Sequence, residues 1–145
     1  MTTDGIPEDQ SLPMELISNA AAALRHGDVT APELLEQHLQ RIHELDPRLN
    51  SFITVDEAGA VKAAKASCER FDAGNPLSIL DGIPIAVKDN VDVAGLPTSN
   101  GSSHFWRPEN DALVSARLRA GGAVIVGKLN MHEGALGATT DNPHH

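Results

Sequence analysis

Two short apolar runs separated by a helical segment constrain the fold of this chain more than any other feature of its sequence. Residues 83–87 read Ile-Pro-Ile-Ala-Val, and residues 123–126 read Ala-Val-Ile-Val without polar alternation. A strand without alternation is typical of a sheet that is buried on both faces. Between the runs, residues 111–120 have helical character and Gly121-Gly122 ends the helix. Strand, helix and strand in this order predict a parallel crossover unit, and therefore an α/β fold.

The first half of the chain predicts helices that cover this sheet. Apolar spacing predicts helices at residues 12–26, 30–46 and 57–71. It also predicts a short strand at residues 52–55. Thr30 and Glu33 have the spacing of a capping box at the start of the second helix. Pro47 is expected to end that helix, because proline lacks the N–H that an interior helical residue donates.

The second half contains a long loop and two further helix starts. Residues 91–110 are rich in Gly, Pro, Ser and Asn and are predicted to be mostly loop, which the aromatic pair 105–106 is expected to anchor against the body of the protein. Asp111 and Asn130 are each expected to cap a helix. The apolar residues expected to be buried on the first of these helices are Leu113, Val114 and Leu118.

Lys88 directly follows the first apolar run and has two interpretations. Where a buried strand meets a cleft, desolvation disfavours the charged ammonium form, and a neutral lysine amine is a usable general base. Alternatively, the strand reaches the surface and Lys88 is simply solvated. The role of base requires the neighbouring carboxylates of Asp81, Asp89 and Asp92 to point elsewhere, because a carboxylate beside the amine favours its charged form. Lys128 follows the second run in the same way and competes for the role.

Longer stretches around these lysines resemble a known family. The stretches cover residues 80–90 (Leu-Asp-Gly-Ile-Pro-Ile-Ala-Val-Lys-Asp-Asn), 95–102, 111–114, 120–131 and 137–142. In this order they resemble the N-terminal part of the amidase signature family, whose members hydrolyse carboxamides with a Ser-Ser-Lys triad. The resemblance implies an α/β fold that is the N-terminal part of the amidase signature fold, with a mixed β-sheet core covered by helices.

The resemblance also implies roles for particular residues. The family's lysine base corresponds to Lys88 rather than Lys128, because it falls within the Gly-Ile-Pro-Ile-Ala-Val-Lys-Asp-Asn stretch. The residues that would border the pocket for the acyl group are Gly134, Ala135, Leu136 and Gly137. The family's Gly-Gly-Ser-Ser-Gly-Gly-Ser stretch carries the nucleophilic serine, the bridging serine and the oxyanion-hole amides, and it follows beyond Asn142. This sequence stops at His145, so residues 11–145 are expected to be the N-terminal portion of an amidase domain, truncated before that stretch.

Other chemically suggestive residues do not form a recognisable site. Residues 102–104 (Ser-Ser-His) are not a nucleophile elbow, because no glycine follows the serines. His38 and His43 lack a partnering cysteine or carboxylate at ligand spacing, and they are expected to face solvent or to pack. Cys68 is the sole cysteine, which excludes an intrachain disulfide and a cysteine zinc site. We therefore expect no metal ion and no cofactor.

Composition limits the partners of the chain. A formal net charge of −9 argues against direct binding of nucleic acid. Residues 1–10 are polar and expected to be frayed, and no apolar run approaches membrane-spanning length, so we expect a cytoplasmic protein without membrane contact. A small-molecule amide is the expected substrate, and homodimerisation stays open. Two functions are therefore carried forward: part of an amide hydrolase that is inactive alone, or a non-catalytic binding or assembly module derived from an amidase.

Overall fold

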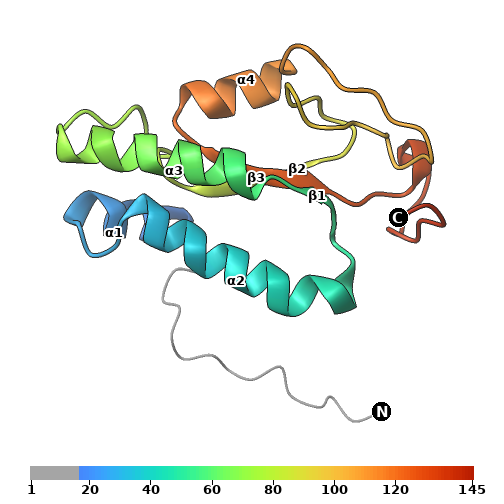
Figure 1. Cartoon of the computed structure of the whole chain (residues 1–145), viewed down its shortest axis with the longest axis horizontal. Helices are drawn as coiled ribbons and strands as arrows, with labels where there is room; N and C mark the ends of the chain where they lie inside the picture. The colour runs from blue at the N-terminus through green and yellow to red at the C-terminus, as the bar shows by residue number, and fades with distance from the viewer. Residues whose placement is uncertain (1–16) are drawn as a thin grey trace, which may run out of the picture.

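The computed structural model describes residues 17–145, which form a three-stranded sheet with helices on both faces (Figure 1). The elements are α1 (Ile17–His26), α2 (Ala31–Leu49), β1 (Phe52–Val55), α3 (Glu57–Asp72), β2 (Pro84–Lys88), α4 (Leu113–Ala120), β3 (Val124–Leu129) and the 3₁₀ turn η1 (Glu133–Ala135). Helices α1, α2 and α3 cover one face of the sheet, and α4 lies over the other (Figure 1). The predicted frayed terminus and the first part of the predicted helix at 12–26 lie outside the described residues.

The sheet has the predicted parallel crossover at its centre. The strand order is β1-β3-β2, in which β3 runs parallel to β2 and antiparallel to β1. The mixed sheet and the α/β class are therefore confirmed. Pro84 is the first residue of the edge strand β2, where its missing N–H breaks no central ladder bond.

A bulge in β3 decides on which side of the sheet Lys128 lies. Ile85 pairs with Ile125, whereas Ala86 pairs with Gly127, so β3 contains one extra residue at this point. A shift of one residue exchanges the two faces of a strand, and Lys128 therefore comes into register with Val87. Glycine is required at position 127, because a Cβ there would collide with the carbonyl oxygen of Thr54.

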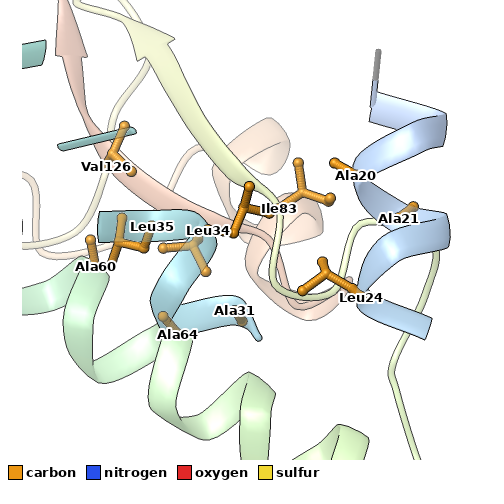
Figure 2. Close-up of a cluster of buried hydrophobic side chains, with 11 residues drawn as sticks. Ala20, Ala21, Leu24, Ala31, Leu34, Leu35, Ala60, Ala64, Ile83 and Val126 are labelled. Atoms are coloured by element: carbon orange, nitrogen blue, oxygen red, sulfur yellow. The ribbon is translucent and has the colours of Figure 1, made fainter. Parts of the chain in front are cut away.

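The larger hydrophobic core lies between the sheet and helices α1, α2 and α3 (Figure 2). Leu34 and Leu35 of α2 lie at its centre, and small residues of α1 and α3 allow the helices to approach closely. The buried members labelled in Figure 2 are Ala20, Ala21, Leu24, Ala31, Leu34, Leu35, Ala60, Ala64, Ile83 and Val126. Val87 and Ile125, with Val93 of the following loop, form a smaller cluster on the α4 side.

Helix α2 begins as predicted but ends later than predicted. The Thr30 hydroxyl accepts a hydrogen bond from the Glu33 amide, and the Glu33 carboxylate accepts one from the Thr30 amide, which completes the capping box. The helix continues through Pro47 to Leu49, so the predicted end before Pro47 is wrong. A proline removes only its own hydrogen bond, and the Asn50 amide still donates to the Asp46 carbonyl at 2.7 Å.

Removing the capping hydroxyl is expected to destabilise the chain measurably. Thr30→Ala should lower the free energy of unfolding by about 1 kcal/mol, because the orphan amide at the helix start loses its acceptor. Thr30→Ser is the matched control, since it keeps the hydroxyl. Urea denaturation of the three proteins checks the prediction, and equal losses for alanine and serine would show that the hydroxyl is not the stabilising group.

Helix α4 contacts the sheet less than the sequence predicted. Leu113 is 66% exposed and Val114 is 55% exposed, so their predicted burial is wrong. The helix is held instead through Ser115, whose hydroxyl donates to the Asp92 carbonyl, and through the half-buried Leu118. Asp111 does not cap α4 but accepts a hydrogen bond from the Ala94 amide.

The aromatic pair at 105–106 also differs from expectation. Phe105 and Trp106 are both exposed, so they do not anchor the loop against the body of the protein. The loop is held by backbone hydrogen bonds between Thr98 and Trp106. No helix in residues 17–145 is long and apolar enough to cross a membrane.

A buried ion pair fixes the turn that precedes β2. Asp81 is 1% exposed, and its carboxylate accepts hydrogen bonds from Arg70 Nε at 2.8 Å and Arg70 Nη2 at 2.7 Å. The Leu77 amide donates to the same carboxylate at 2.8 Å. Burial opposes ionisation, but these hydrogen bonds outweigh it and hold the pKa of Asp81 below its ordinary value.

This depressed pKa predicts a loss of stability in acid. A carboxyl group with a lower pKa in the folded state contributes stability that is fully present above its unfolded pKa, about 4. That contribution is lost as the pH falls from there through the folded pKa. We expect the urea midpoint of the parent chain to fall more steeply below about pH 4 than that of the Arg70→Met/Asp81→Asn double variant. Parallel curves for the two proteins would contradict this role of Asp81.

Candidate active site around Lys88

Lys88 is the last residue of β2 and opens onto a depression of about 410 Å³. Its Nζ donates a hydrogen bond to the Asn130 carbonyl oxygen at 2.9 Å. The depression is lined by Leu49, Asn50, Ser51, Lys88, Leu129, Asn130, Thr140, Asp141, Asn142 and His145. Most of these residues carry amide, hydroxyl or carboxylate groups, so the site can form hydrogen bonds with a polar ligand.

The environment of Lys88 differs in one respect from the expectation. A dry lysine was expected, but the Lys88 side chain is exposed, because the segments around it leave the depression open to solvent. The prediction that the neighbouring carboxylates point away from the Lys88 amine agrees with the structure. Within residues 17–145, no carboxylate forms an ion pair with Lys88: Asp81 is bound by Arg70 and Asp89 by Lys128.

Lys128 is in the opposite situation. It is 0% exposed, and its Nζ lies 3.3 Å from Asp89 Oδ1. The ammonium also donates to Thr98 Oγ1 at 2.8 Å and to the Pro97 carbonyl at 3.3 Å. Because the side chain is fully buried and enclosed by a carboxylate and oxygen acceptors, Lys128 Nζ is not accessible to a substrate. Lys128 is therefore part of the buried interior, whereas Lys88 opens onto the depression.

The sequence interpretation missed the hydrogen-bond network around Asp89. Asp89 Oδ2 accepts from the Ser99 amide at 3.0 Å, the Ser99 hydroxyl at 2.6 Å and the Gly101 amide at 3.1 Å. On the other side of this turn, Asn142 Nδ2 donates to the Gly101 carbonyl at 2.8 Å. The available signals were an acid directly after Lys88 and a glycine in the loop at a position that has φ of +73° in the structure.

The predicted acyl-pocket residues lie beside the depression and not in its lining. Gly134 and Ala135 form η1 with positive φ angles of 62° and 59°. Leu136 is 88% exposed and Gly137 is exposed. None of these four residues lines the depression, and their contact with a substrate stays a prediction. The predicted cap at Asn130 is wrong, because η1 begins after His132 and Asn130 Oδ1 instead accepts from the Met131 amide.

Chemically suggestive groups also lie in other parts of the described chain. Ser102 donates to the Ser99 and His104 carbonyl oxygens, and Ser103 lies 3.1 Å from the His104 ring on the surface. In residues 17–145 no three His, Cys, Asp or Glu side chains gather in a way that would hold a metal ion. A hollow of about 650 Å³ between α2 and α3 is lined by apolar residues together with Glu36, His43 and Glu44. His43 Nε2 lies 2.8 Å from Glu57 Oε1 on the exposed surface.

Comparison with known proteins identifies the family. A sequence profile described as Amidase matches residues 33–145, which is most of the chain. The chain belongs to the amidase family. The amidase structures that it matches confirm the fold, since parts of them superpose on this arrangement of helices and mixed sheet.

The relatives of this amidase-family chain are considerably longer than it is. It is 45% identical over 128 residues to a subunit of the glutamyl-tRNA(Gln) amidotransferase of Chloroflexus aurantiacus, and the match covers 87% of this chain and 26% of that protein. The corresponding protein of Salinispora arenicola is 43% identical over 83% of this chain and 25% of its own length. The peptide amidase of Stenotrophomonas maltophilia has a TM-score of 0.78 and 34% identity, covering 83% and 26% of the two chains. This chain thus spans about a quarter of the relatives it matches.

Proposed function

We propose that this chain supplies the lysine base and one wall of the active site of an amide hydrolase. The reaction converts a carboxamide to a carboxylate with release of ammonia or an amine. The observation that carries the proposal is the position of Lys88, whose amine opens onto a polar depression and is bonded to a carbonyl oxygen. A carbonyl acceptor orients the amine and, unlike a carboxylate, places no opposite charge beside it.

In the proposed mechanism, Lys88 Nζ is the final acceptor of the proton from a nucleophilic serine. A bridging serine passes that proton to the lysine while the nucleophile attacks the amide carbon, and the proton then returns to the departing amine. Water hydrolyses the acyl-enzyme in a second step of the same kind. By resemblance to the family, both serines and the oxyanion-hole amides belong to sequence beyond Asn142.

The same reasoning proposes that the chain is inactive alone. A lysine that works as a base must be largely dehydrated, whereas Lys88 is exposed in this chain. The exposed apolar residues Leu113 and Val114 of α4 support this proposal, because further protein could cover them. These residues also favour the second candidate, a non-catalytic binding module derived from an amidase.

The substrate is proposed only as a class. The names of the relatives specify a peptide amidase and a subunit of an amidotransferase, and a carboxamide is what the proposed chemistry shares with both. The polar lining around Lys88 suits the donors and acceptors of an amide group. The cytoplasmic location, the homodimer and the absence of nucleic-acid and membrane partners stay predictions.

Two measurements test the proposal. The purified 145-residue chain should release no ammonia from a peptide amide, and turnover that Lys88→Ala abolishes would contradict its inactivity. Replacing the matching quarter of the peptide amidase with residues 17–145 of this chain gives a protein that we call the grafted amidase. The grafted amidase should hydrolyse a peptide amide. A folded but inactive grafted amidase would favour the non-catalytic module.

A further inference from the structure

The buried Lys128–Asp89 pair does not line the Lys88 depression. Lys88 is the exposed last residue of β2, whereas Asp89, directly after the strand, is buried. Asp89 is 0% exposed, and its Oδ1 receives no hydrogen bond and is contacted by the Lys128 ammonium. The proposed mechanism uses neither of these two charged groups.

The other oxygen of Asp89 holds the turn at residues 99–101. Three donors converge on Oδ2: the Ser99 amide, the Ser99 hydroxyl and the Gly101 amide. A carboxylate that accepts three hydrogen bonds fixes its donors more rigidly than a single contact would. Lys128 makes this arrangement tenable, because a buried carboxylate without a cation is strongly disfavoured.

The 99–101 turn also contacts two residues of the wall of the depression. Asn142 Nδ2 donates to the Gly101 carbonyl at 2.8 Å and to the Met131 carbonyl at 2.6 Å. His145 Nε2 lies 3.1 Å from Ser99 Oγ and 2.9 Å from the Ser102 carbonyl. Both Asn142 and His145 line the depression, so a continuous set of contacts joins Asp89 to the wall.

We propose that Asp89, neutralised by Lys128, is a positioning residue that fixes the wall of the depression relative to Lys88. The carboxylate acts through the 99–101 turn and does not touch the substrate. This inference rests on the proposed amide-hydrolase function for its catalytic consequence, but the physical linkage is a property of this chain. Lys88 and Asp89 are consecutive in the sequence, so the proposed base and the residue that positions the wall are neighbours in the chain.

Two double variants separate positioning from simple loss of charge. Asp89→Asn/Lys128→Gln replaces the ion pair with two amides and keeps an oxygen that can accept from the Ser99 and Gly101 amides. Asp89→Ala/Lys128→Gln removes the same charges and also removes that acceptor. Changing both partners avoids an unpaired buried charge, which would by itself unfold part of the chain.

The first readout is amide hydrogen exchange of the 145-residue chain, measured by NMR. We expect Gly101 protection to be retained in the asparagine variant and to fall about tenfold in the alanine variant, as for one lost hydrogen bond. Residues 140–142 should become more mobile in the alanine variant, and their chemical shifts should change. Equal protection of Gly101 and equal chemical shifts of 140–142 in both variants would overturn the proposal.

The second readout is amide hydrolysis by the grafted amidase. The alanine variant should lose about 100-fold in kcat, the cost of a displacement of about 1 Å, and the asparagine variant should recover most of this loss. Equal activity in the two variants would overturn the catalytic consequence. An inactive parent grafted amidase would refute the proposed function, and hydrogen exchange would still decide the linkage.

A third variant guards against failure of both double variants to fold. Asn142→Ala removes the donor to the Gly101 and Met131 carbonyl oxygens from the wall side and leaves the buried pair intact. We expect it to fold and to loosen residues 140–142 while Gly101 keeps its protection from Asp89. An unchanged wall in this variant would show that the contact between Asn142 and the turn does not hold it.

Discussion

Replacing Lys88 with alanine in the grafted amidase is expected to lower kcat about 1,000-fold or more, the contribution of a general base together with the activated nucleophile it serves. The nucleophilic serine hydroxyl would then have no acceptor for its proton. Global stability should change little, because Lys88 is exposed and its side chain donates to the Asn130 carbonyl on the rim of an open depression. The measurement is ammonia release from a peptide amide under saturating substrate.

Two matched lysine variants make this result specific. Lys65→Ala removes an exposed lysine of α3 that does not line the depression, and it should leave kcat unchanged. Lys128→Ala should instead destabilise the protein, because it leaves Asp89 as a buried carboxylate without its cation. A Lys88→Ala variant with kcat near that of Lys65→Ala would remove Lys88 from the mechanism.

Arg70→Met is expected to lower the free energy of unfolding by about 3–5 kcal/mol. The Asp81 side chain is 0% exposed, whereas the Arg70 side chain is 27% exposed. Removing Arg70 therefore leaves a buried carboxylate without its two strongest donors. The loss should appear as a lower urea midpoint with an unchanged slope.

The two ends of this ion pair should not be equivalent. Asp81→Asn leaves an arginine that water can partly solvate, so its cost should be smaller, about 1–3 kcal/mol. Arg119→Met is the surface control, because Arg119 contacts Asp111 at 3.4 Å with a side chain that is 43% exposed. Its cost should be below about 1 kcal/mol. If Arg70→Met cost no more than Arg119→Met, the buried pair would not stabilise the fold.

Local sequence signals predicted the elements that depend on local chemistry. The Thr30 capping box and the parallel pairing of β2 with β3 are both present. Each follows from a few neighbouring residues: the groups that bond the free amides at a helix start, or a short apolar run. The burial of α4 was not predictable in this way: Leu113 and Val114 indicate an apolar helix face, but a pattern does not say which surface will cover it.

The site was predicted in part for a related reason. The position of Lys88 at the end of a strand follows from the apolar run before it. The side on which Lys128 lies depends on the bulge at Gly127, which moves its side chain to the face of Val87. A bulge is a property of strand pairing, and the sequence of one strand does not reveal it. The Asp89 network escaped prediction because it joins residues 89, 99, 101 and 142.

The most direct test of the role of Lys88 is the formation of the acyl-enzyme. The grafted amidase and its Lys88→Ala variant would be incubated with a peptide amide, quenched in acid at short times and weighed by intact-protein mass spectrometry. The account predicts a transient acyl adduct on the parent and none on the variant, with both proteins folded. An adduct that forms on Lys88→Ala at the rate of the parent would contradict the assignment of Lys88 as the base.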